Sequence, residues 1–552
     1  MKKILIALLA IVLVASACSK LDVTPESQYT LGNFPKTPLD YTALIGPIYT
    51  QLASKYAIEY FRMQELTTDE AIIPGRDGNY DDGGQYRQHH HHTYTPDHSN
   101  VKDVWGWGFG AINTCNRVLN NIANSSMAET DPSRIASTAE VKAMRALFYF
   151  FMMDIYGNVP IVDTFPVNDL PATKTRAQVF AFVEKELKAV AGKLPVKDGA
   201  NPQGTYAHPT KGMVFALLAK MYINAEVYLG PGNTKYAETV AMCDSVIASK
   251  KYALDPSYAS VFAPDNGPNT TETIFAIPYD PLLLDGNQFT RHGFMAYLYP
   301  VYGVPNNLSI SMSTTPEFYN RFNLAGDERN NTWLLGKQTY KDGTPYTIKI
   351  TKKDLDASYT GPSGDTVWQL EITKTLTMTG KKPFDVGNDY KARCMGIRSI
   401  KYYPDRATTA LTRMSGNDMP IFRLADIYLM KAEAIVRSGG MAALKTTVNG
   451  EMQDEIVLMN KVRARAKAPT VSAVSLDDLL DERAREFYWE NWRRNDLIRF
   501  NKYETEYPIP GDLATPGYTP GMDKSLYRRL FPVPNSERKL NTKLAQNDGY
   551  PQ

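Results

Sequence analysis

Two amphipathic stretches, residues 210–228 and 235–249, constrain the fold of this chain more than any other feature. The apolar positions of the first stretch fall on one helical face: Val214, Leu217, Leu218, Met221, Ala225 and Tyr228. The second stretch repeats the spacing with Tyr236, Val240, Cys243 and Ile247. Gly230-Pro231-Gly232 separates them, so the pair predicts a helical hairpin of tetratricopeptide character. Neither helix can bury its apolar face alone, so such hairpins stack on neighbouring helices.

Three other segments show the helical period. Residues 135–156 end at Gly157, residues 420–437 end at Gly439-Gly440, and residues 476–500 form a long amphipathic stretch dense in charge. These segments lie in both halves of the sequence. We therefore expect one mostly α fold with a discontinuous helical-hairpin scaffold, residues 37–250 and 416–505, rather than separate N- and C-terminal domains.

Residues 251–415 have a different character. They are rich in Asn, Gly, Pro and Thr, and their short alternating run at 346–351 (YTIKIT) predicts a strand. We expect a large loop-rich insertion region here, because loops on a rigid scaffold usually carry binding sites. Residues 506–552 are expected to form a C-terminal tail.

The start of the chain predicts a targeting segment. Lys2 and Lys3 precede an apolar run at 4–14, and the small residues Ala15-Ser16-Ala17 stand directly before Cys18. This pattern is typical of a secretory signal over residues 1–17. A cysteine at this place resembles a bacterial lipobox, which implies a lipidated (palmitate-bearing) N-terminus at Cys18 and a tether over residues 18–36. The alternative is an ordinary signal peptide with a chance cysteine.

Composition and motifs exclude several classes of function. The net charge is +2, from 61 basic and 59 acidic residues, so nothing indicates a nucleic-acid partner. The sequence contains no nucleophile elbow, phosphate-binding loop, dinucleotide fingerprint or zinc-protease motif. We expect no cofactor and no catalysis. Cys115, Cys243 and Cys394 are far apart and are expected to be small buried hydrophobic residues.

Several motifs resemble the SusD/RagB family of nutrient-binding lipoproteins from Bacteroidetes. They are residues 145–150 (RALFYF) with 156–160 (YGNVP), 423–434 (RLADIYLMKAEA), 460–465 (NKVRAR), 481–486 (DERARE), 493–499 (RRNDLIR), and 530–534 (LFPVP) with Asn541 and 546–550 (QNDGY). Their order spans nearly the whole chain. The resemblance implies a single SusD-like fold over residues 37–552 and docking on a TonB-dependent, SusC-like transporter. It also implies display at the outer face of the outer membrane.

The segment 66–110 is the first candidate for ligand binding. Its glycine-rich chain combines aromatic rings, which stack on sugar faces, with side chains that hydrogen-bond hydroxyl groups. The candidate contacts are Asp69, Arg76, Tyr80, Tyr86, Arg87, Tyr94 and Asn100. The Pro-Gly-Arg and Asp-Gly-Gly runs of this segment resemble starch-binding family members, which implies an α-glucan. Trp105 and Trp107 are expected in the core, because they lead into a helix.

A second aromatic cluster is the candidate for the other wall of the site. It contains Phe294, Tyr297, Tyr299 and Tyr302, of which Tyr297 and Tyr299 are the candidate contacts, and Trp333 is a further candidate. The four histidines at 89–92 invite a metal interpretation. Consecutive loop residues cannot easily converge on one ion, so we predict no metal there.

Glu482 and Glu486 lie one helical turn apart beside arginines. Two carboxylates on one helical face cannot straddle a glycosidic bond, so a network of ion pairs is expected instead of acid–base chemistry. The predicted function is capture of an oligosaccharide at the cell surface and its delivery to the transporter. The alternatives are a different glycan or a peptide as cargo, a glycoside hydrolase, and a lid that only stabilises the transporter.

Overall fold

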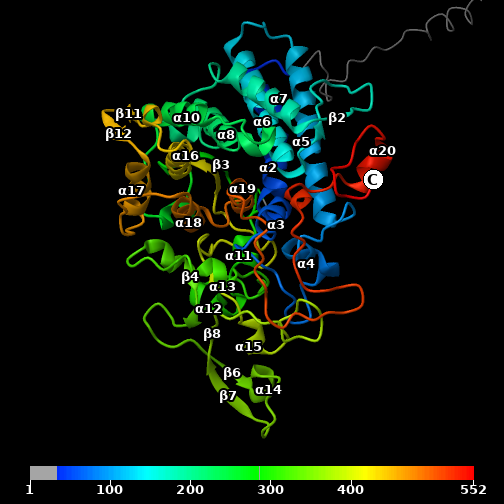
Figure 1. Cartoon of the computed structure of the whole chain (residues 1–552), viewed down its shortest axis with the longest axis vertical. Helices are drawn as coiled ribbons and strands as arrows, with labels where there is room; N and C mark the ends of the chain where they lie inside the picture. Colours follow the sequence, from blue (N-terminus) through cyan, green and yellow to red (C-terminus); the bar gives the residue numbers. More distant parts are fainter. Residues whose placement is uncertain (1–33, 285) are drawn as a thin grey trace, which may run out of the picture.

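The structure, a computed structural model, describes residues 34–284 and 286–552. The predicted signal peptide, Cys18 and most of the tether lie outside these residues and stay predictions. The longer helices form the upper part of the molecule (Figure 1). They are α2 (Pro38–Lys55), α5 (Ser99–Ala123), α6 (Pro132–Tyr156), α7 (Arg176–Val190), α8 (Lys211–Ile223), α10 (Tyr236–Ala248), α16 (Leu424–Arg437), α17 (Glu455–Arg465) and α18 (Leu476–Phe487). None of the helices in the described part is both long and apolar enough to cross a bilayer.

Short helices connect and cover this scaffold. They are α3 (Phe61–Glu65), α4 (Gln85–His90), α9 (Ala225–Leu229), α11 (Phe289–His292), α12 (Tyr299–Tyr302), α13 (Pro316–Tyr319), α14 (Lys352–Leu355), α15 (Tyr390–Arg393), α19 (Arg493–Arg499) and α20 (Asn535–Leu540). A π-helical turn at Tyr56–Tyr60 joins α2 to α3.

The strands of the described residues pair two by two, always antiparallel. The pairs are β1 (Val159–Pro160) with β2 (Thr173–Lys174), β3 (Thr273–Ile277) with β10 (Met419–Arg423), β4 (Trp333–Leu334) with β9 (Arg398–Ser399), β5 (Gly336–Lys337) with β8 (Glu371–Ile372), β6 (Thr347–Thr351) with β7 (Asp365–Gln369), and β11 (Thr446–Val448) with β12 (Glu451–Gln453). The predicted strand at 346–351 is therefore confirmed as β6. The β6–β7 hairpin forms the lower tip of the molecule (Figure 1).

The predicted hairpin is confirmed as α8 and α10, which pack against each other and against α16. Gly230 and Gly232 adopt positive φ angles of 97° and 82° in the turn between them, a conformation that favours glycine. The first helix is interrupted at Asn224, where we predicted continuity. The side chain of Asn224 donates to the carbonyl of Lys220 at 2.8 Å and accepts from Arg499 at 3.0 Å, which favours a break between α8 and α9.

The predicted helix at 135–156 is confirmed as α6. Its final residues are buried on all sides, and Gly157 ends it with a φ of 70°. The helix at 420–437 was predicted to start too early. Met419–Arg423 is the strand β10, buried throughout and paired with β3. Apolar residues at this spacing fit both structures, and the distant partner strand decides between them.

The predicted long helix at 476–500 is also divided, into α18 and α19. Trp489 and Asn491 between them have φ angles of 60° and 67°. The backbone N–H of Trp489 donates to Glu70 at 2.8 Å, and the Asn491 side chain donates to the carbonyl of Tyr56 at 3.1 Å. These contacts with the start of the chain replace the helical hydrogen bonds that a continuous helix would make.

The charged residues of α18 form the buried ion-pair network that the sequence predicted. Glu486 accepts hydrogen bonds from Arg423, Arg465 and Arg329, and Glu482 pairs with Arg463 at 2.9 Å. Burial raises the pKa of Glu486, but the charges of Arg465, Arg423 and Arg329 outweigh burial and lower it. This carboxylate therefore stays charged and serves structure. Cys115, Cys243 and Cys394 are free and buried, as expected.

Candidate functional site

The beginning of the first candidate segment is interior, contrary to our prediction. Asp69 is fully buried and accepts two hydrogen bonds of 2.8 Å from Arg493. Arg76 is also fully buried, and its guanidinium donates to the carbonyls of Ser311, Arg393 and Met395. Both side chains use their polar groups to join distant segments, so we correct their assignment from ligand contacts to structural residues.

Tyr86, Tyr94 and Asn100 need the same correction. Tyr94 is fully buried, stacks on Phe531 at 4.2 Å between ring centroids, and donates to the carbonyl of Arg528. Asn100 is buried in α5 beside His89. Tyr86 is 6% exposed and lies under the Arg62 guanidinium, 5.3 Å from its ring centroid. Trp105 and Trp107 are buried in α5, which confirms that they belong to the core.

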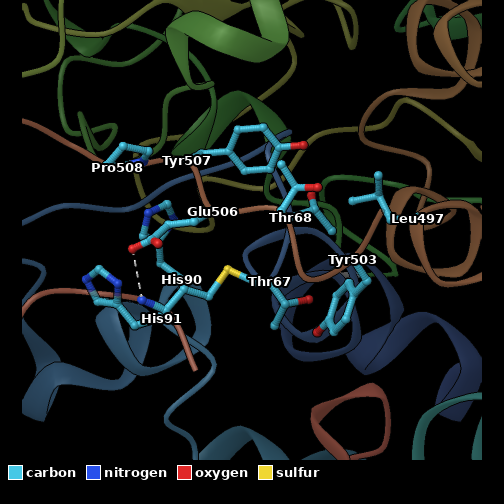
Figure 2. A pocket seen from close by; sticks show the side chains of 11 residues that line it. Thr67, Thr68, His90, His91, Leu497, Tyr503, Glu506, Tyr507 and Pro508 are labelled. Atoms are coloured by element: carbon cyan, nitrogen blue, oxygen red, sulfur yellow. Dashed lines mark hydrogen bonds between the residues drawn. The ribbon is translucent and has the colours of Figure 1, made fainter. Parts of the chain in front are cut away.

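The four histidines are buried and point to different partners. His89 lies beside Asn100, His90 packs on Phe384, His91 contacts Asp512 and Tyr518, and His92 bonds to the carbonyl of Thr67. Figure 2 shows His90 and His91 on one wall of a pocket that faces Thr67, Thr68 and Tyr503. Its volume is 20 Å³, which is room for about one water molecule and not for a sugar. Among the described residues, no group of three or more His, Cys, Asp or Glu side chains is arranged so that it could hold a metal ion.

Tyr80 connects the first candidate segment with the second. It is half-buried and packs on the same apolar cluster as Tyr297 and Tyr302, around Phe294 and Met295. Its hydroxyl accepts a hydrogen bond from the backbone N–H of Ile310 at 3.4 Å. Residues more than two hundred positions apart in the sequence therefore meet at one place, as expected for two walls of a single site.

Tyr297 contacts both a second ring and a guanidinium group. It stacks on Tyr390 with ring centroids 4.9 Å apart and an interplanar angle of 20°. Its hydroxyl accepts from Arg393 at 3.1 Å, and Arg393 also pairs with Asp77. Burial raises the pKa of Tyr297 to about 12, so the hydroxyl stays protonated and can donate to a sugar oxygen.

Tyr299 and Tyr302 extend the surface along α12. Tyr299 is 40% exposed, and Tyr302 packs edge-on against Phe294 at 5.0 Å. We call Tyr80, Tyr297, Tyr299, Tyr302 and Tyr390 the tyrosine cluster. Flat rings beside guanidinium and carboxylate groups are the combination that recognises a pyranose, whose ring face is apolar and whose edge is polar. No local pattern in the sequence pointed to Tyr390 and Arg393, because only the fold brings them to Tyr297 and Asp77.

Two other predicted contacts lie away from this cluster. Trp333 is 7% exposed and stacks on Tyr488 at 4.4 Å, so it belongs to the core and its assignment as a contact is corrected. Arg87 lies 4.3 Å from the ring centroid of Tyr518 and 3.6 Å from the Asp81 carboxylate. It is half-buried and holds the C-terminal tail against α4.

A larger groove of 560 Å³ lies between α5, α6 and α7. Its floor is the Arg145–Glu186 ion pair, with contacts of 2.7 and 2.8 Å, and its walls carry Lys142 and Lys185. Among the described residues, Phe182 is the one aromatic side chain that lines it. The groove therefore offers no paired rings for stacking within the described structure, and the tyrosine cluster remains the better candidate for a sugar.

Two family descriptions match the chain. The SusD family matches residues 271–550, and a family described as starch-binding and associating with the outer membrane matches residues 21–223. Among curated proteins, the chain is similar to starch-binding protein SusD of Bacteroides thetaiotaomicron. The two are 28% identical over 441 residues, which cover 76% of this chain and 74% of the relative.

Solved structures show the same fold. A SusD superfamily protein from Parabacteroides distasonis has a TM-score of 0.67 at 20% identity, covering 94% of this chain and 100% of that one. Surface glycan-binding protein A from Bacteroides thetaiotaomicron, solved with laminarihexaose, has a TM-score of 0.65 at 20% identity, covering 92% and 98%. The predicted mostly α, SusD-like fold class is thus confirmed.

The names of these relatives describe binding, and the family is one of non-catalytic binding proteins. This agrees with the prediction that the protein is not an enzyme. The family match spans more than half of the chain, and the fold agrees with it over nearly the whole length. The chain therefore belongs to the SusD family.

Proposed function

We propose that this protein captures oligosaccharides at the cell surface through the tyrosine cluster and passes them to a TonB-dependent outer-membrane transporter. The observation that carries the proposal is the stacked pair Tyr297–Tyr390, with Arg393 and Asp77 at its edge. A sugar ring that stacks on a half-exposed tyrosine displaces water from two apolar faces, and the charged edge hydrogen-bonds its hydroxyl groups. No bond is made or broken in such a mechanism.

The cargo is a glycan of several sugar units. The name of the relative SusD supports an α-glucan, which is also what the sequence resemblance implies. The similar glycan-binding protein that was solved with laminarihexaose supports a different glucan. Both glucans belong in the test. Peptide cargo is the alternative, and a peptide library measured beside the glycans separates the two.

Isothermal titration with maltohexaose and laminarihexaose tests the site. Replacing Tyr297 and Tyr390 together by alanine is expected to weaken binding by roughly tenfold or more, because both stacking rings are lost. Tyr236→Ala, on α10 in the helical scaffold, is the matched control and should bind as the wild type does. Full affinity in the double variant would relocate the site.

The anchor and the transporter are the remaining parts of the proposal. Cys18 is proposed to carry the lipid, and Cys18→Ser should release the mature protein from the membrane fraction. The transporter should co-purify with the lipidated protein. Uptake that survives in a folded variant without glycan affinity would favour the alternative role as a lid.

A further inference from the structure

Three arginines from distant parts of the sequence lie on segments that meet around α11. Arg62 lies in α3, Arg291 in α11, and Arg413 in the loop before β10. Arg62 and His292 line the same small cavity, and the backbone N–H of Ser415 donates to the carbonyl of Asn287 at 3.0 Å, which holds the Arg413 loop beside α11. Burial, and then the charges of all three arginines, lower the pKa of His292. Figure 1 shows α3, α4 and α11 at the junction of the helical and the strand-bearing parts.

These arginines have no acidic partners in the described part of the chain. No carboxylate forms an ion pair with Arg62, Arg291 or Arg413, and their guanidinium groups donate no hydrogen bond to protein atoms. The Nε of Arg291 is buried without a partner. Two acids of neighbouring segments interact with other residues. Glu59 pairs with Lys55 at 2.9 Å, and burial together with Asp82 raises the pKa of Tyr86.

Two fully buried arginines elsewhere in the described residues have partners for their guanidinium groups. Arg329 pairs with Asp327 and Glu486, and Arg76 donates to backbone carbonyls. Arg62, Arg291 and Arg413 are half-exposed, so water partly solvates them, but positive charges without acidic partners still repel one another, and a bound anion relieves this repulsion. Guanidinium groups match the planar carboxylate and the oxygen atoms of a sulfate or phosphate particularly well.

Arg291 is joined to the tyrosine cluster through the segment that contains Ser309 and Ile310. Burial and the charges of Arg413 and Arg62 lower the pKa of Arg291, and Tyr80 and Tyr86 partly offset this. The hydroxyl of Tyr80 bonds to Ile310, and the neighbouring N–H of Ser309 donates to the carbonyl of Arg291 at 2.9 Å.

We propose that Arg62, Arg291 and Arg413 form a subsite for a negatively charged substituent of the captured glycan. This inference rests on the proposed function and names its substrate class: an oligosaccharide with carboxylate or sulfate groups. The tyrosine cluster holds the ring, and the arginines bind the acidic group at its edge. Neutral glucans contact only the tyrosine cluster.

Titration calorimetry with three ligands of matched length tests the proposal: a neutral glucan, a uronic-acid oligosaccharide and a sulfated oligosaccharide. The wild type should prefer an acidic ligand, and the two acidic arms tell carboxylate from sulfate. Arg62→Gln, Arg291→Gln and Arg413→Gln should each weaken acidic binding roughly tenfold and leave neutral binding unchanged. Arg117→Gln, on the exposed face of α5, is the control for overall charge.

Added salt should weaken acidic binding in the wild type and much less in the variants. Equal affinity for neutral and acidic ligands, or arginine variants that bind the acidic ligand as the wild type does, would overturn the subsite and leave glycan capture standing. If the folded wild type binds none of the three ligands, and none of them changes its melting temperature, the proposed function is overturned together with the subsite.

Discussion

Arg493 donates two hydrogen bonds of 2.8 Å to the two carboxylate oxygens of Asp69, joining residues 424 positions apart. Both side chains are buried, so the pair fastens the start of the first candidate segment to α19. Burial raises the pKa of Asp69, but the charge and hydrogen bonds of Arg493 outweigh burial and lower it. The Asp69 carboxylate is therefore charged, and both of its oxygens accept hydrogen bonds from a side chain of the protein itself.

Asp69→Asn should therefore destabilise the protein, because it leaves the Arg493 charge buried without a counter-ion. We expect a loss of about 3–5 kcal/mol in the free energy of unfolding, measured in urea. The control is Asp481→Asn, whose half-exposed carboxylate pairs with Arg321 at 3.0 Å and should cost less than about 1 kcal/mol. Folded Asp69→Asn protein should bind glycan normally, and a selective loss of binding would return Asp69 to the site.

Asp69 also shows why the sequence misled us about the site. An acid in a glycine-rich, aromatic segment fits a sugar contact, and nothing nearby reveals an arginine more than four hundred residues away. The same holds for Arg76, whose carbonyl partners lie more than two hundred positions along the chain. Tyr80 and Tyr297 were named from the sequence and remain candidate contacts, since both are half-buried and belong to the tyrosine cluster. Tyr390 and Arg393 were not named, because only the fold brings them to Tyr297.

The helices were predicted well where local signals decide. Gly157 ends α6 and the glycines at 230 and 232 form the hairpin turn, since positive φ is a local demand of the backbone. The predictions failed at Asn224, Pro420 and Trp489. At each of these places a hydrogen bond or a strand partner from far along the chain outweighs the helical period.

A close crossing of α5 and α6 gives a second prediction. A Cβ atom on Gly108 would lie 2.1 Å from the sulfur of Met152, whose side chain is fully buried. Gly108→Ala should cost about 1–3 kcal/mol of stability. Gly106→Ala and Gly110→Ala lie in the same helix with open space around them, and should gain about 0.5–1 kcal/mol. Equal melting temperatures for the three variants would contradict the crossing.

Alanine substitutions at Tyr94 and Tyr297 should affect different properties, the first the stability of the fold and the second the binding of the glycan. Tyr94→Ala removes a buried ring that stacks on Phe531, and we expect a loss of about 3–5 kcal/mol without loss of glycan affinity in the folded fraction. Tyr297→Ala removes a half-exposed ring. This variant should keep most of its stability and lose glycan affinity. Thermal unfolding and titration on both variants check this. Reversed results would place the ligand in the interior of the 80–94 segment.

The buried acids Glu65 and Glu70 predict an unusual pH dependence. Glu65 is fully buried, and burial raises its pKa to about 7, despite its hydrogen bond with Glu70 and the charge of Arg493. The folded state therefore holds a proton that the unfolded state releases near pH 4.5. This contribution to stability is fully present below pH 4.5 and is lost as the pH rises to about 7, by about 3 kcal/mol at most.

Glu65→Gln keeps the shape of the protonated acid and cannot ionise, so the stability of the variant should not fall in this way. Burial lowers the pKa of His90 to about 3 and of His92 to about 4, and these histidines destabilise the fold as the pH falls below 6.5. Both proteins carry these histidines, so the difference between variant and wild type reports on Glu65 together with Glu70, whose pKa burial and Glu65 raise. Urea unfolding from pH 4.5 to 8 should show the advantage of Glu65→Gln growing with pH. A constant difference would mean that Glu65 is ionised in the folded protein throughout this range.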